Sequence, residues 1–194
     1  MIPANAVVED LLSEIVLRRL AEPRFAIGTV YGRRGVGYIA SQIRAFNNAA
    51  RGAPWIVLAD LDNNACAPGL IRNWLPNGPN PNLILRIAVR EVEAWLLADA
   101  ATFAQMLGIA AHLVPTQPEN LPDPKRALIA TCRHSRRREL RKDVLPRHPS
   151  DAQGPGYNER VGQFVNSAWQ PGVARRSAPS LDRAMNALAS FQWP

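Results

Sequence analysis

Two aspartates follow a short apolar run in the middle of the chain, at a spacing suited to binding a cation. Residues 55–59 are apolar, and Asp60 and Asp62 come directly after them, separated by Leu61. In extended backbone, side chains two residues apart share a face and lie about 6.6 Å apart along the strand. The two carboxylates therefore suit one hard cation at the end of the strand. The alternative is that both acids are ordinary turn residues before the next helix.

A second apolar run, residues 6–8, also ends in acids, Glu9 and Asp10. If its strand lies beside the strand of residues 55–59, Glu9 reaches the same edge as Asp60 and Asp62. Three carboxylates in one small volume repel each other, and a divalent metal relieves that repulsion. The alternative is that the acids near Glu9 only favour the N-terminus of the following helix, with about 0.3 to 1 kcal/mol each.

Short apolar runs alternate with longer amphipathic segments over the first half of the chain. This alternation is typical of a mostly parallel α/β sheet, whose strands are buried on both faces and joined by helices. The predicted strands are residues 4–8, 25–31, 55–59 and 83–89. The predicted helices between them are residues 11–20, 36–46 and 68–74. Open sheets of this kind bind ligands at the carboxyl ends of their strands, where the acids lie.

Helices dominate the chain after residue 89. They are expected over residues 91–98, 100–107, 124–133, 158–169 and 180–191. Residues 114–124 hold four prolines and are predicted to be extended. We therefore predict an α/β core over residues 1–112 and a helical, loop-rich C-terminal extension over residues 113–194, packed on the core.

Several short motifs together resemble a known family. They are Glu9 after the first strand, Asp60-Leu61-Asp62 after a later one, Glu91-Val92-Glu93-Ala94-Trp95-Leu96-Leu97-Ala98-Asp99, Pro118-Glu119-Asn120-Leu121 and Asp123-Pro124-Lys125. The placement of the first acids is similar to that in Toprim domains of topoisomerases, primases and nucleases. The whole set resembles an uncharacterised bacterial Toprim-like family that is often encoded beside an ATPase in apparent phage-defence loci. The resemblance extends to about residue 170.

This resemblance implies an activity, a cofactor and a partner. Glu9, Asp60 and Asp62 would hold Mg²⁺ or Mn²⁺ and cleave the phosphodiester bonds of DNA or RNA, with Glu9 as a metal ligand or an acid/base group. Glu93 would join the metal site through the Glu-Ala-Trp match, and Glu91 would lie at the surface. The protein would be the effector of an ATPase partner in antiphage defence. A topoisomerase reaction is excluded, because the three tyrosines lack a distinguishing context and the chain is short.

Asp10 departs from the family pattern, because Toprim domains usually follow the first glutamate with glycine. This departure leaves a second hypothesis, in which the chain is a non-catalytic subunit that binds and regulates an ATPase.

The positive charge of the chain points to an anionic partner. Lysine and arginine outnumber aspartate and glutamate by 23 to 16, which gives a formal charge of +7. The Gly32–Gly37 loop carries two arginines beside the predicted metal edge, and residues 133–142 hold six basic residues against one acid. The residues predicted to contact nucleic-acid phosphates are Arg33, Arg34, Lys125, Arg136, Arg137, Arg138 and Arg141. A third hypothesis is thus a basic nucleic-acid-binding module whose acids are only turn residues.

Other classes are disfavoured by the sequence. The order of glycines in the Gly32–Gly37 loop differs from the dinucleotide fingerprint and from a P-loop, so the chain is not expected to bind ATP by itself. No apolar run is long enough to cross a membrane, and the first residues lack the features of a signal peptide. We therefore expect a cytoplasmic protein, with Cys66 and Cys132 as reduced thiols.

Overall fold

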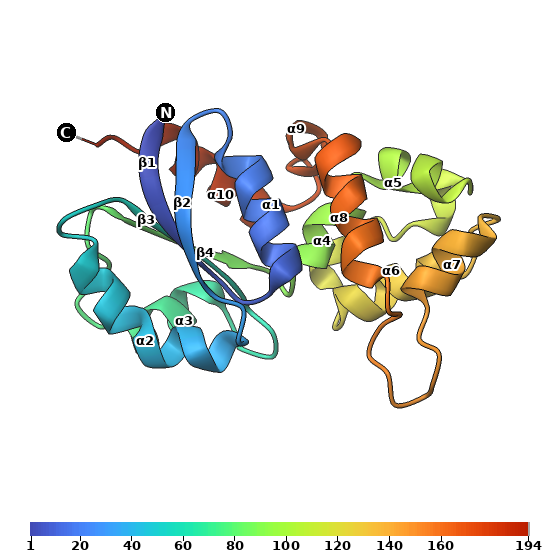
Figure 1. The fold of residues 1–194 in the computed structure, drawn as a ribbon, viewed down its shortest axis with the longest axis horizontal. Helices are drawn as coiled ribbons and strands as arrows, with labels where there is room; N and C mark the ends of the chain where they lie inside the picture. The colour runs from blue at the N-terminus through green and yellow to red at the C-terminus, as the bar shows by residue number, and fades with distance from the viewer. Residues whose placement is uncertain (194) are drawn as a thin grey trace. The chain divides into compact units, whose positions relative to one another are not determined.

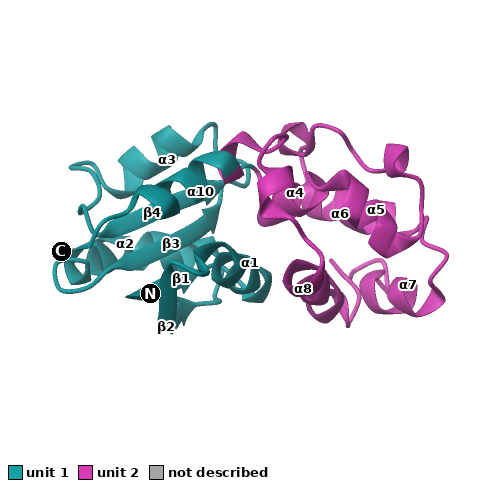
Figure 2. Cartoon of the chain, turned by 90° about the horizontal axis from the view of Figure 1, so that it is seen from above, with its two compact units in different colours: residues 1–89, 182–194 teal, residues 90–181 magenta. Residues whose placement is uncertain are grey.

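The computed structural model describes residues 1–193 and divides the chain into two compact units. Unit 1 comprises residues 1–89 and the C-terminal segment from Asp182, whereas unit 2 comprises Arg90–Leu181. Figure 2 colours the two units separately. The division falls at residue 89 instead of the predicted residue 112, and it assigns the C-terminal segment to the same unit as the sheet.

Four parallel strands form the sheet of unit 1, which confirms the predicted α/β class. They are β1 (Ile2–Val8), β2 (Phe25–Gly32), β3 (Trp55–Asp60) and β4 (Leu83–Ala88). The order across the sheet is β2-β1-β3-β4. The chain first moves from β1 outward to β2 and then returns to add β3 on the other side of β1. The sheet therefore has a topological switch point between β1 and β3.

Helices cover both faces of this sheet. They are α1 (Leu11–Ala21), α2 (Val36–Ala49), α3 (Ala67–Trp74) and α10 (Pro179–Ser190), which enters unit 1 at Asp182. In Figure 1, α2 and α3 lie on one face of the sheet, and α1 and α10 lie on the other. Each connection from strand to helix leaves the carboxyl edge of the sheet, so the strand ends and the first turns of α1 and α2 share that edge.

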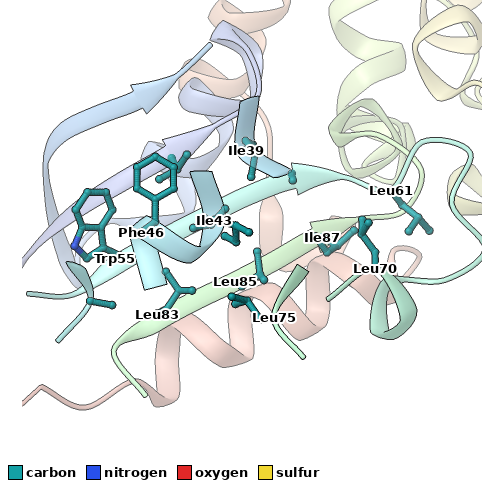
Figure 3. Packing of buried hydrophobic residues seen from close by; sticks show 14 residues of the cluster. Ile39, Ile43, Phe46, Trp55, Leu61, Leu70, Leu75, Leu83, Leu85 and Ile87 are labelled. Atoms are coloured by element: carbon teal, nitrogen blue, oxygen red, sulfur yellow. The ribbon is translucent and has the colours of Figure 1, made fainter. Parts of the chain in front are cut away.

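The core between the sheet and α2 and α3 holds the strands in register (Figure 3). Every residue of β3 is buried, as expected for a central strand with helices on both faces. Burial of each large aliphatic side chain contributes about 1.5 to 3 kcal/mol. The labelled members of this cluster are Ile39, Ile43, Phe46, Trp55, Leu61, Leu70, Leu75, Leu83, Leu85 and Ile87.

Unit 2 is helical. Its helices are α4 (Val92–Leu97), α5 (Ala100–Leu107), α6 (Pro124–Cys132), α7 (Arg138–Val144), α8 (Tyr157–Ser167) and α9 (Pro171–Ala174), with the 3-10 turns η1 (Ala111–Leu113) and η2 (Pro118–Asn120). Trp95 is fully buried, and its indole Nε1 donates to Ser180 Oγ at 2.7 Å. Trp169 Nε1 donates to the Trp95 carbonyl oxygen at 3.2 Å, so two buried tryptophans hold α4 against the later part of the unit.

Two features of unit 2 differ from the sequence prediction. The segment of residues 114–124, predicted to be extended, contains the turn η2, and the basic stretch after residue 133 forms the helix α7, which was not predicted. The chain contains free thiols at Cys66, which is exposed, and Cys132, which is buried. Across residues 1–193, no helix has both the length and the apolar character needed to span a membrane.

Candidate metal centre

The ends of β1 and β3 bring three carboxylates into one cluster. These neighbouring strands pair Val8 with Leu58, so Glu9 follows β1 beside Ala59, one residue before Asp60. One carboxylate oxygen from each of Glu9, Asp60 and Asp62 lies within 4.8 Å of the other two. The cluster lies at the carboxyl edge of the sheet and at its topological switch point, where open α/β sheets bind ligands.

The two aspartates reach the cluster through different backbone conformations. Asp60 is the last residue of β3 and is buried. Leu61 extends the pairing, since its N–H donates to the Ala88 carbonyl at 2.9 Å. Asp62 then turns into the left-handed region with φ +48°, which aspartate adopts more readily than most residues. The extended backbone expected from the sequence therefore ends at Leu61, and a turn at Asp62 brings the second carboxylate close to Asp60.

Burial and neighbouring acids favour the protonated form of Glu9. Burial, together with the charges of Asp62 and Asp10, raises the pKa of Glu9 to about 7. The backbone N–H groups of Asp60 and Val36 oppose this shift, and the Asp60 N–H donates to Glu9 Oε2 at 3.2 Å. Burial also raises the pKa of Asp62. A cation at this position would offset both the desolvation and the repulsion between acids.

The loop after β2 is fastened to the end of β1 beside Glu9. Arg33 N donates to the Val8 carbonyl at 2.9 Å, and Gly35 N donates to the Glu9 carbonyl at 3.0 Å. Gly32 has φ +98°, and a Cβ there would lie only 2.1 Å from the Val8 oxygen. Glycine is therefore required at this position for both conformation and close approach. The loop ends where α2 begins at Val36, whose N–H faces the Glu9 carboxylate.

The two arginines of this loop both contact other side chains of unit 1. Arg33 Nε donates to Glu14 Oε2 at 2.6 Å, and Glu14 Oε1 accepts from Arg18 Nε at 3.0 Å. The Arg34 guanidinium carbon lies 5.5 Å from the centre of the Tyr38 ring. Arg33 thus anchors the loop, although Arg33 and Arg34 are both exposed. Nothing in the sequence pattern indicated Glu14 as the anchor of this loop.

Asp10 serves as the N-cap of α1. Its Oδ1 accepts from the backbone N–H and from the hydroxyl of Ser13, both at 2.8 Å. Its backbone is extended, with φ −146°, a conformation open to any residue. Aspartate is therefore accommodated at this position without strain and stabilises the helix that follows Glu9.

Glu93 belongs to unit 2 and has partners there. Its carboxylate is buried and accepts from the Tyr157 hydroxyl at 2.8 Å, and Lys125 Nζ lies 5.2 Å from the centre of the Tyr157 ring. Burial raises the pKa of Glu93 to about 7, although the Lys125 charge opposes the shift. Glu91 is the N-cap residue of α4, and its Oε2 accepts from Lys125 N at 2.8 Å. The acidic cluster found in the described residues contains Glu9, Asp60 and Asp62 and does not include Glu93.

The predicted phosphate-binding residues of the basic stretch are mostly exposed. Arg136 and Arg137 precede α7, Arg138 begins it, and all three are exposed. Arg141 is partly buried and donates to the Ser135 carbonyl oxygen. The structure therefore presents three adjacent guanidinium groups on the surface of unit 2.

Comparisons of the chain with known proteins found no match. Neither a family model, nor a curated protein, nor a solved structure matches it. The activity of the chain is therefore inferred from its own geometry. The backbone donors at Asp60 and Val36 are part of that geometry, and they carry no signal in the sequence because every residue type but proline has an N–H.

Proposed function

We propose that this chain is a Toprim-like, metal-dependent nuclease that hydrolyses phosphodiester bonds of DNA or RNA. The observation that carries the proposal is the convergence of Glu9, Asp60 and Asp62 at the switch point of a parallel sheet, with ligand oxygens within 4.8 Å of one another. The positive charge of +7 supports a polyanionic substrate.

The donor set fits Mg²⁺ or Mn²⁺. Both ions prefer oxygen ligands, and the three groups are all carboxylates. A bound ion of this kind would activate water and stabilise charge on the leaving oxygen of a phosphodiester. We limit the proposed protein ligands to Glu9, Asp60 and Asp62, because Glu93 accepts a hydrogen bond from Tyr157 within unit 2.

The residues themselves have separable roles in this proposal. Asp60 is buried and held by the sheet, which suits a fixed ligand. Glu9 has a pKa of about 7, so it exchanges a proton near neutral pH and suits an acid/base group as well as a ligand. Backbone N–H groups hold the Glu9 carboxylate in place in either role.

The cellular setting in this proposal follows from the substrate and from the family resemblance. A nuclease acting on intracellular or invading nucleic acid works in the cytoplasm. The partnership with an ATPase in antiphage defence rests on the resemblance of the motifs described above. In this part of the proposal, the ATPase regulates the nuclease.

The test is cleavage of plasmid DNA and of transfer RNA by the purified chain with Mg²⁺ or Mn²⁺. We expect metal-dependent nicking or cutting that is abolished by EDTA and by the double variant Asp60→Ala, Asp62→Ala. A matched control is the double variant Glu22→Gln, Glu139→Gln, which removes two exposed acids outside the cluster and should cleave like the parent.

The same assay separates the proposal from its alternatives. Cleavage that persists in the aspartate double variant contradicts the assignment of the site. Nucleic-acid binding without cleavage, unchanged in the aspartate variant, favours a basic binding module. An inactive chain that forms a stable complex with an ATPase encoded beside it favours a regulatory subunit, and repeating the assay with that complex and ATP then decides between regulation and latent nuclease activity.

A further inference from the structure

Unit 2 contains a cavity that lies outside the acidic cluster. Its volume is about 680 Å³, and it lies between α6 and the segment that follows α7, with all its lining residues in unit 2. Both elements can be followed in Figure 1, where the segment after α7 forms a long loop. The volume is within the range of pockets that bind small organic ligands.

One face of α6 supplies three cationic side chains to this cavity. They are Lys125 and Arg126 in the first turn and Arg133 at the C-terminus of the helix, and Ile129 and Ala130 line the wall between them. This spacing places all five residues along one side of a helix. The ion pairs found among the described residues do not include Arg126 or Arg133, whereas Lys125 lies over the Tyr157 ring and its charge acts on Glu93.

The acids in the cavity wall each accept a hydrogen bond from the backbone. The bonds run from Lys125 N to Glu91 Oε2 at 2.8 Å, from Arg126 N to Asp123 Oδ1 at 2.7 Å and from His148 N to Asp151 Oδ2 at 3.1 Å. These carboxylates start α6 and close the turn at His148, so they shape the wall. Lys125, Arg126 and Arg133 also line the cavity, so its wall carries cationic side chains beside these acids.

The loop that forms the opposite wall is fixed at its base. Gly154 N donates to the Val144 carbonyl and Gly156 N donates to the Asp143 carbonyl, both at 2.9 Å. A Cβ at Gly154 would lie 2.3 Å from the Asp143 oxygen, so the close approach requires glycine. Pro146 and Pro149 then line the cavity from this loop and add apolar surface opposite Ile129.

We propose that this cavity binds the phosphate group of a nucleotide, with Arg126 and Arg133 contacting the phosphate oxygens. Guanidinium groups bind phosphate through paired, charge-assisted hydrogen bonds. The apolar wall of Ile129 and the two prolines suits the sugar or the base. The phosphate belongs either to a free nucleotide or to the end of a nucleic-acid strand. This site uses none of the acidic residues of unit 1 and holds independently of the proposed nuclease activity.

The test is binding in EDTA, measured by isothermal titration with adenosine 5′-monophosphate and by fluorescence anisotropy with a 5′-phosphorylated oligonucleotide. The variant Arg126→Ala, Arg133→Ala should weaken binding by about tenfold to a hundredfold, as expected for the loss of two charge-assisted contacts. The matched control is Arg51→Ala, Arg176→Ala, which removes the same charge from exposed positions outside the cavity lining and should change binding to the mononucleotide little.

A second variant tests the shape of the cavity without changing its charge. Ala130→Trp places a large side chain in the cavity without altering the charge, and it should also abolish binding, with circular dichroism confirming the fold. Competition by the mononucleotide against the phosphorylated strand identifies a strand end as the source, whereas mononucleotide binding without competition identifies a free nucleotide.

Two outcomes overturn the proposal. One is adenosine binding as tightly as its 5′-monophosphate, because then the phosphate is not the recognised group. The other is equal weakening by the two arginine double variants, because then general charge explains the attraction. Binding by the Asp60→Asn, Asp62→Asn variant should match the parent, so a failure of the nuclease proposal leaves this result unchanged.

Discussion

Two glutamates, one partly buried in unit 1 and one fully buried in unit 2, have similar pKa values for partly different reasons. Burial raises the pKa of both Glu9 and Glu93 to about 7. Glu93 has a hydroxyl donor in Tyr157 and a compensating charge in Lys125. Glu9 has backbone N–H donors, and the charged side chains that shift its pKa are the acids Asp62 and Asp10.

The comparison shows why a raised pKa does not by itself identify a functional carboxylate. Unit 2 supplies Glu93 with its own hydrogen-bond donor and its own cation, so the group is stable inside a closed core. Unit 1 instead gathers acids around Glu9, and an added cation is the natural means to relieve their repulsion. The nature of the neighbours distinguishes a candidate site from a structural contact.

The largest expected effect is the contribution of Glu93 to the pH dependence of the free energy of unfolding. Glu93 has a pKa of about 7 in the folded chain against an ordinary value of 4.5, so between these values the folded state holds a proton that the unfolded state has lost. Its contribution is complete below about pH 4.5 and is lost as pH rises through 7, at a cost on the order of 3 kcal/mol. Glu93→Gln should remove this part of the pH dependence, as measured by urea unfolding at pH 5 and pH 7.5.

A control for this experiment is Tyr157→Phe. It removes a hydrogen bond that lowers the pKa of Glu93, so the loss of stability should continue to a higher pH than in the parent. If parent and Glu93→Gln lose the same free energy of unfolding between the two pH values, the buried carboxyl does not titrate as described.

Metal addition should affect only the cluster of unit 1. At a hundred times its dissociation constant, a bound ion stabilises the folded state by about 2.7 kcal/mol, which is a rise in melting temperature of roughly 5 to 10 °C for a chain of this size. We expect this rise with Mg²⁺ or Mn²⁺ in the parent and in Glu93→Gln, and its loss in Glu9→Gln and in Asp60→Asn. The apparent affinity should fall as pH drops below 7, because protons compete with the metal for Glu9.

An equal rise in melting temperature in Glu9→Gln and Glu93→Gln would contradict this prediction, since metal binding would then be independent of the cluster.

The smallest effect concerns Asp10, which neighbours Glu9 and caps α1. Asp10→Ala should destabilise the chain by about 1 kcal/mol, whereas Asp10→Gly should cost only a few tenths of a kcal/mol. Chemical denaturation measures both. Cleavage by Asp10→Gly should equal that of the parent, because the Asp10 carboxylate accepts from Ser13. A large gain in cleavage by Asp10→Gly would instead mean that this aspartate suppresses activity.

The agreement between sequence and structure is closest in unit 1. Its strands β3 and β4 are fully or largely buried and its helices are amphipathic, so the apolar pattern located β3, β4, α1 and α2 closely. The helices of unit 2 were harder to predict from the sequence. Helices α7 and α9 are short, with seven and four residues, and their stability depends on tertiary contacts. The unit boundary also escaped prediction, because α10 returns to the sheet from the far end of the chain.

By itself, the sequence determined that a parallel α/β sheet forms and that acids follow two of its strands, because burial and strand endings depend on local residue patterns. Only the tertiary structure decided that β1 and β3 are neighbours, which brings Glu9 within reach of Asp60 and Asp62. It also decided that Glu93 accepts from Tyr157, a partner 64 positions along the chain. Contacts at such separation depend on the packing of whole elements, which no short stretch of residues encodes.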